Sequence, residues 1–132
     1  MPSDNDANIK LLSAVDLNQN FTIDDIANKA TFDVLADVEI GADLNQVVDS
    51  FDLHVAIRNL TKSETVATVT KTGTLTPDPT PKAFLNAERV NIPANWAPAD
   101  VGDVLQAVAS YIVTAGANKD FSTAQSQTFV VS

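Results

Sequence analysis

The residues that most often carry enzyme chemistry are scarce in this sequence. The chain has one histidine, His54, and no cysteine. His54 alternates with apolar neighbours, which predicts a place on the polar face of a strand. A catalytic triad needs a nucleophile and an orienting carboxylate around the imidazole, and no spacing here indicates either. One histidine without a thiolate also disfavours a zinc site. We therefore expect a protein that is not an enzyme.

Carboxylates are the abundant reactive groups, and they suit a hard cation such as calcium. The chain has 17 Asp and Glu residues, and calcium binds carboxylate, amide and backbone oxygens in loops. The segment 4–8 begins like an EF-hand loop, but Ile9 and Val15 replace its glycine and its bidentate glutamate. Two pairs in other polar loops are the candidate metal ligands: Asp24, Asp25, Asp100 and Asp103. Calcium is thus the one candidate cofactor, in a protein otherwise expected to need none.

Trp96 is the one candidate ligand-binding aromatic residue. It lies in a loop between Pro93 and Pro98, where an exposed ring could form a platform for a sugar. The alternative is that the ring closes the end of the hydrophobic core beside Val101, since a large ring is usually mostly buried. We favour this second interpretation.

Composition and charge exclude several classes of partner. The net charge is −9, and the eight Lys and Arg residues form no cluster, so nucleic acid and anionic membranes are poor partners. No stretch approaches the roughly 20 apolar residues of a membrane span. The polar start, residues 1–6, does not resemble a secretory leader. The compartment stays open between the cytoplasm and an extracellular domain excised from a longer chain.

Hydrophobic periodicity predicts strands along most of the chain. Apolar and polar residues alternate over 31–40 and 51–58, which a half-buried strand produces and a helix does not. The β-branched run 65–76 favours a strand by composition. Further strands are expected over 85–92, 104–115 and 121–131, with helix a rival for 104–115. A strand or a short helix is expected over 9–15, after a flexible segment 1–8.

Turn signals separate these strands. One helical turn is expected over 22–27, where Thr22 precedes Asp25 at capping-box spacing. A polar connection or helical turn is expected over 43–50, and a hairpin loop over 116–120. A bulge is expected near Lys71 or Gly73. The prolines of segment 77–81 cannot join a ladder, so we expect an extended crossover there.

The segment 107–113, Ala-Val-Ala-Ser-Tyr-Ile-Val, resembles the penultimate strand of immunoglobulin-like domains, including the fibronectin III type. The resemblance implies that Tyr111 forms a tyrosine corner and that Val113 stands where relatives have cysteine. Ala107 departs from the acidic residue usual there, and the strand 51–58 has no tryptophan. We therefore expect an all-β, antiparallel two-sheet immunoglobulin-like sandwich of about seven strands, formed by residues 9–132 as one domain. Such a resemblance carries no function.

These features predict a non-catalytic interaction or structural module with a protein partner. It would use a sheet edge or the loops at one end of the sandwich, as part of a larger surface or assembly protein. The alternative is a calcium-dependent ligand- or carbohydrate-binding domain that uses its Asp-rich loops and Trp96. The sequence leaves the oligomeric state open.

Overall fold

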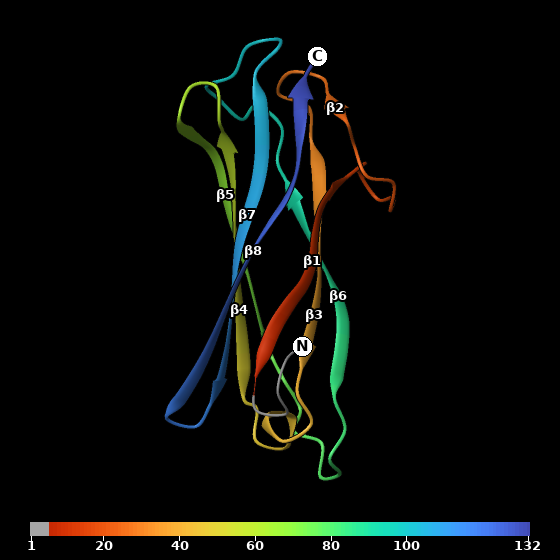
Figure 1. Ribbon diagram of the computed structural model, residues 1–132, viewed down its shortest axis with the longest axis vertical. Helices are drawn as coiled ribbons and strands as arrows, with labels where there is room; N and C mark the ends of the chain where they lie inside the picture. Colours follow the sequence, from red (N-terminus) through yellow and green to blue (C-terminus); the bar gives the residue numbers. More distant parts are fainter. Residues whose placement is uncertain (1–5) are drawn as a thin grey trace.

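Alternating apolar residues turn one face of every long strand toward a shared core in the computed structural model, which describes residues 6–132. The predicted all-β sandwich is confirmed: two sheets pack face to face along the long axis of the molecule (Figure 1). The strands are β1 (Ala7–Val15), β2 (Asp25–Ile26), β3 (Phe32–Ile40), β4 (Ser50–Asn59), β5 (Glu64–Thr74), β6 (Phe84–Ile92), β7 (Val104–Ala115) and β8 (Asn118–Val131). The only helical element within residues 6–132 is the 3-10 turn η1 (Leu44–Gln46). This part of the chain has no helix long and apolar enough to cross a membrane.

The two sheets differ in size. The smaller has the order β1-β3-β6 and the larger the order β2-β8-β7-β4-β5. All neighbours are antiparallel except β2, which runs parallel to β8. The proline-rich segment 75–83 carries the chain from β5 in the larger sheet to β6 in the smaller one, at the lower end of Figure 1. The predicted crossover is therefore present.

The two long sides of the sandwich are closed in different ways. On one side, β1 lies against β8, where the Ala7 amide donates to Asp120 Oδ2 at 2.6 Å and the Ile9 amide to Ser122 Oγ at 3.1 Å. On the other side, the edge strands β5 and β6 are joined by an ion pair of 2.7 Å between Lys71 and Glu88. The contact between the sheets on this second side is therefore made by charged side chains, one of which is buried.

The segments 9–15 and 104–115, for which the sequence allowed either a strand or a helix, are both strands. β1 begins at Ala7, inside the segment 1–8 expected to be flexible, and residues 1–5 lie outside the described residues. In β7, buried and half-buried residues alternate along its whole length. Burial of one face therefore outweighs the helix propensity of its alanines and leucine.

Two local predictions are wrong. Residues 22–27 do not form a helical turn, because Asp25 and Ile26 pair with Val130 and Val131 of the last strand. The bulge also does not fall at Lys71 or Gly73. The register of β4 and β5 shifts beside Ile57 instead.

Gly73 has a packing role in place of the expected bulge. A Cβ atom there would lie 2.6 Å from Cε1 of Phe51, its partner on β4. The absence of a side chain lets the Phe51 ring lie across β5. This glycine is therefore explained by close approach of a ring to the backbone.

Tyr111 does not form the tyrosine corner that the resemblance implied. Its side chain is fully buried, and its hydroxyl has no hydrogen-bond partner among the described residues. The ring lies 5.8 Å from that of Phe51. Burial, and secondarily the charge of Glu88, raise the pKa of Tyr111 far above its usual value. The hydroxyl points into the sandwich and not back to a loop as a corner requires.

Candidate functional site

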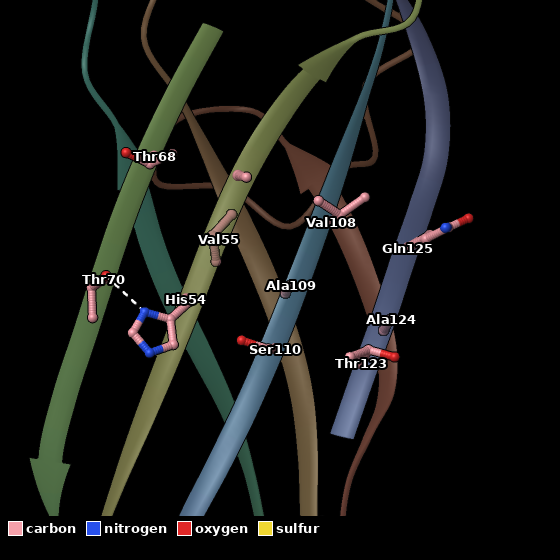
Figure 2. Close-up of a pocket in the computed structure, with 11 residues that line it drawn as sticks. His54, Val55, Thr68, Thr70, Val108, Ala109, Ser110, Thr123, Ala124 and Gln125 are labelled. Atoms are coloured by element: carbon pink, nitrogen blue, oxygen red, sulfur yellow. Dashed lines mark hydrogen bonds between the residues drawn. The ribbon is translucent and has the colours of Figure 1, made fainter. Parts of the chain in front are cut away.

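The outer face of the larger sheet carries a broad hollow. We call it the outer hollow; it measures about 770 Å³, within the range of small-ligand sites. Figure 2 shows its lining on the strands β5, β4, β7 and β8, which lie side by side. The lining residues are His54, Val55, Ala56, Thr68, Thr70, Val108, Ala109, Ser110, Thr123, Ala124 and Gln125.

Strand register explains where the outer hollow lies. Cross-strand pairing aligns Thr70, His54, Ser110 and Thr123 in one row, and Thr68, Ala56, Val108 and Gln125 in the next. Most of these side chains are small, so the sheet surface is low here. The flanking rows carry larger groups: Arg58 and Gln106 on one side, and Asp52, Ile112 and Phe121 on the other. The hollow is therefore a shallow trough across four strands.

His54 is the one ionisable group that lines the outer hollow. It is exposed on the outer face, as its alternation predicted, and its Nδ1 lies 3.0 Å from Thr70 Oγ1 (Figure 2). An imidazole that activates a hydroxyl is normally oriented by a third group. Among the described residues, the His54 side chain forms a hydrogen bond with Thr70 and with no orienting carboxylate. The arrangement offers hydrogen bonding to a ligand without an assembled proton relay.

Phe121 stands beside the outer hollow with 65% of its surface exposed. The sequence reasoning missed it, because Phe121 has the same parity as the core residues Phe129 and Val131. The β7–β8 register shifts by one residue between Gln106 and Val108, and a shift of one residue exchanges the two faces of a strand. Ser126 marks the position of the bulge in the sequence. Its Oγ accepts the Ala107 amide at 3.0 Å, where the register shifts.

Asp100 and Asp103 lie close together, but a lysine lies between their carboxylates. Lys62 Nζ is 2.7 Å from Asp100 and 3.4 Å from Asp103. Hydrogen bonds from the Asn59 side chain and the Asp100 amide, together with Lys62, lower the pKa of Asp103. The hydrogen bond to Asp100 in turn raises the pKa of Lys62. An ammonium group thus occupies the position that a cation would take.

Asp24 and Asp25 lie near the same end of the sandwich, along the last strand. The Asp24 carbonyl accepts the amide of Val130, and the Asp103 carbonyl accepts that of Val131. The loops of the two predicted pairs therefore do converge on the end of β8. Among residues 6–132, however, no three His, Cys, Asp or Glu side chains gather as a metal site would require. Calcium binding at these four residues stays a prediction.

Trp96 packs into the end of the core. It is 4% exposed, and its indole nitrogen donates to the carbonyl oxygen of Ala30 at 2.7 Å. Its ring meets that of Phe32 edge-on at a centroid distance of 6.2 Å. Val101, the neighbour expected from the sequence, is 72% exposed. The favoured interpretation of Trp96 as a core residue fits this geometry, with Phe32 as its partner.

A charged cluster around Asp33 and Arg89 holds the loop after β1 against the smaller sheet. Asp33 Oδ2 accepts Arg89 Nη1 at 2.6 Å and the Asn18 amide at 2.9 Å, while Asp33 Oδ1 accepts the Asn91 side chain at 3.0 Å. Arg89 also donates to the carbonyl oxygen of Gln19. Burial would raise the pKa of Asp33, but the hydrogen bonds from Asn91, Asn18 and Arg89 outweigh it and lower the pKa. These contacts hold the loop after β1 against β3 and β6.

No protein-family model matches this chain. No curated protein matches it significantly either. Its function has therefore to be inferred from the geometry of its own residues.

Proposed function

We propose that this chain is a non-catalytic interaction module with an immunoglobulin-like sandwich, and that it binds a protein partner in the outer hollow. The order of its strands supports the fold assignment. If the seven long strands are lettered A, B, C, C′, E, F and G in chain order, the sheets are A-B-E and G-F-C-C′. Immunoglobulin-like domains pair A, B and E in one sheet and C, F and G in the other.

The single observation that carries the binding proposal is the outer hollow with Phe121 at its rim. Exposed aromatic residues beside a concave surface are typical binding hot spots. The trough runs across four strands, so it can hold an extended or loop segment of a partner. Its lining contains no Asp, Glu, Lys or Arg residue. The surface therefore favours a partner segment of neutral, partly apolar side chains over a charged one.

Two buried carboxylates away from the outer hollow are engaged in the fold. The carboxylates of Asp33 and Asp103 are buried, and each contacts a lysine or arginine. Such pairs are costly to break, so they are poor candidates for a reaction that changes their charge. This supports the proposal of a binding role.

The test uses peptides selected from a random displayed library against the purified chain. We expect Phe121→Ser and Ala56→Arg to weaken the selected peptide about tenfold or more, which corresponds to about 1.4 kcal/mol. Phe21→Ser is the matched control, because Phe21 is 73% exposed on a loop far from the hollow in sequence. Selection of no peptide, or weakening by Phe21→Ser alone, would overturn the proposal.

A neutral oligosaccharide is the second candidate ligand. Four hydroxyl side chains line the outer hollow: Thr68, Thr70, Ser110 and Thr123. With the amide of Gln125 they can exchange hydrogen bonds with sugar hydroxyls, and the Phe121 ring can stack on a sugar face. The net charge of −9 disfavours acidic glycans. Binding to neutral glycans on an array, lost in Phe121→Ser, would favour this ligand over a peptide.

A further inference from the structure

Three polar side chains gather on the inner side of the two edge strands that face each other across the open side of the sandwich. Lys71 on β5 pairs with the buried Leu53 of β4. On β6, Asn86 and Glu88 pair with residues of β3 that are also buried. Pairing of this kind places Lys71, Asn86 and Glu88 on the faces that line the interior.

One carboxylate contacts both other groups. Glu88 Oε1 lies 2.7 Å from Lys71 Nζ, and Glu88 Oε2 accepts Asn86 Nδ2 at 2.5 Å. The Glu88 side chain is only 6% exposed, while that of Lys71 is 41% exposed and that of Asn86 also reaches solvent. An amine and a carboxamide are thus held on the two oxygens of a single, nearly dry carboxyl group.

Attack by Lys71 requires that its ammonium group first give up a proton, and the carboxylate of Glu88 is the base in contact with it. Leu53, the cross-strand partner of Lys71, is fully buried. The Tyr111 hydroxyl, whose pKa burial and the charge of Glu88 raise, has no partner among residues 6–132. Lys71 Nζ also donates to the carbonyl oxygen of Arg89 on β6 at 3.5 Å, which keeps the amine beside that strand. A lysine amine is a nucleophile once it has given up its proton.

We propose that Lys71 and Asn86 form an amide cross-link between β5 and β6, with Glu88 as the proton carrier. Glu88 takes a proton from Lys71, and the free amine attacks Cγ of Asn86. The Lys71 Nζ–Asn86 Cγ bond forms and the Asn86 Cγ–Nδ2 bond breaks. Glu88 returns its proton to the leaving nitrogen, which departs with the second proton of the amine as ammonium. The reaction needs no oxidant or other reagent.

Proximity supplies the rate. Both reactants are held on one carboxyl group, and rotation about the flexible Lys71 stem brings Nζ to the 3–3.5 Å from Cγ that attack requires. Well-oriented intramolecular reactions of this kind gain effective molarities of about 10⁵ M or more. The product joins two edge strands of different sheets, and so adds a covalent link on the side of the sandwich where Lys71 contacts Glu88 and the carbonyl oxygen of Arg89.

Mass spectrometry of the purified chain tests the proposal. We expect the intact mass to be about 17 Da below that of the sequence, for loss of one ammonia. Trypsin would then fail to cut after Lys71 and would release residues 63–82 joined to residues 83–89. Without the cross-link, the same digestion yields the separate peptides 63–71, 72–82 and 83–89.

Three variants assign the chemistry. Asn86→Ala and Lys71→Arg should each restore the full mass, and Glu88→Gln should do so while leaving both reactants in place. Lys10→Arg is the matched control, since Lys10 forms an exposed ion pair with Glu39 at 3.7 Å on the same sheet as β6; it should keep the deficit. Because Asn86 is exposed, Asn86→Ala should fold even if Glu88→Gln does not.

Two results would overturn the proposal. A full intact mass with three separate peptides would mean that Lys71 and Glu88 form an ion pair and nothing more. A deficit confined to peptide 83–89, with normal cleavage after Lys71, would instead mean that Asn86 has closed on its own backbone as a succinimide.

Discussion

Asp33 is a buried carboxylate on the outer face of its sheet. Its hydrogen bonds to Arg89, Asn91 and the Asn18 amide hold the loop after β1 against β3 and β6. Hydrogen bonds to a charged group contribute more than neutral ones, and the donors around Asp33 would lose their acceptor if its charge were removed. This residue therefore connects loop order to the charge state of one side chain.

We expect Asp33→Asn to lower the free energy of unfolding at pH 7 by about 1.5–3 kcal/mol. The pKa of Asp33 is lowered from 3.8 in the folded chain, so its stabilisation is complete above 3.8 and is lost as the pH falls through the folded pKa. Urea unfolding at pH 7 and at pH 3 measures this. The variant and the natural chain should differ less at pH 3 than at pH 7.

Asp37→Asn is the control for this comparison, because Asp37 lies on the same strand and face but is exposed. It should change stability by less than about 0.5 kcal/mol. Equal effects of the two substitutions, or an Asp33→Asn difference that is independent of pH, would show that the charge of Asp33 does not hold the loop.

Strand β5 illustrates how an edge strand adapts to the core beneath it. Phe51 projects from β4 across Gly73, where a Cβ atom would come within 2.6 Å of the ring. Further along, Lys71 turns inward from the same strand to meet Glu88. Charged side chains that point inward are among the ways in which proteins keep an edge strand from pairing with other chains.

We expect Gly73→Ala to lower the free energy of unfolding by about 1–3 kcal/mol, because the added methyl group overpacks the contact with Phe51. Phe51→Leu removes the ring edge that the methyl group meets. The double variant should therefore be destabilised less than the sum of the two single variants. Chemical denaturation of all four chains gives the coupling energy. Strict additivity would contradict a direct contact between the ring and residue 73.

The whole molecule is acidic, which by itself would suggest a cation-binding protein. The chain carries a net charge of −9, yet its most closely paired loop carboxylates, Asp100 and Asp103, share the ammonium group of Lys62. A cation entering there would have to displace Lys62 and leave it near a like charge. Calcium at this pair would therefore compete with Lys62 for the same oxygens.

We therefore expect the melting temperature in millimolar calcium to differ by less than about 1 °C from that in EDTA, with magnesium as the control ion. A ligand at 100 times its Kd would add about 2.7 kcal/mol and raise the melting temperature by several degrees. Such a rise, specific to calcium, would return Asp24, Asp25, Asp100 and Asp103 to consideration as ligands. Lys62→Met should then strengthen the effect.

Much of the architecture follows from local pattern. The alternation of Phe32 to Ile40 and of Phe51 to Arg58 predicts both the strands and the faces that the structure buries. The prolines of segment 77–81 predict the crossover, because proline cannot donate to a ladder. These features depend on neighbours in sequence, so a single chain read in order contains them.

The sites depend on pairing between distant segments. His54 meets Thr70, Ser110 and Thr123 in one row because of the order and register of four strands, and Phe121 faces outward because a bulge shifts β8 by one residue. Lys71 and Glu88 meet across two sheets that share no backbone ladder. Period-two alternation assigns a side chain to one of two faces, but it does not say which strand lies beside it. That choice depends on the packing of the whole core, and it places the outer hollow and the cluster between β5 and β6.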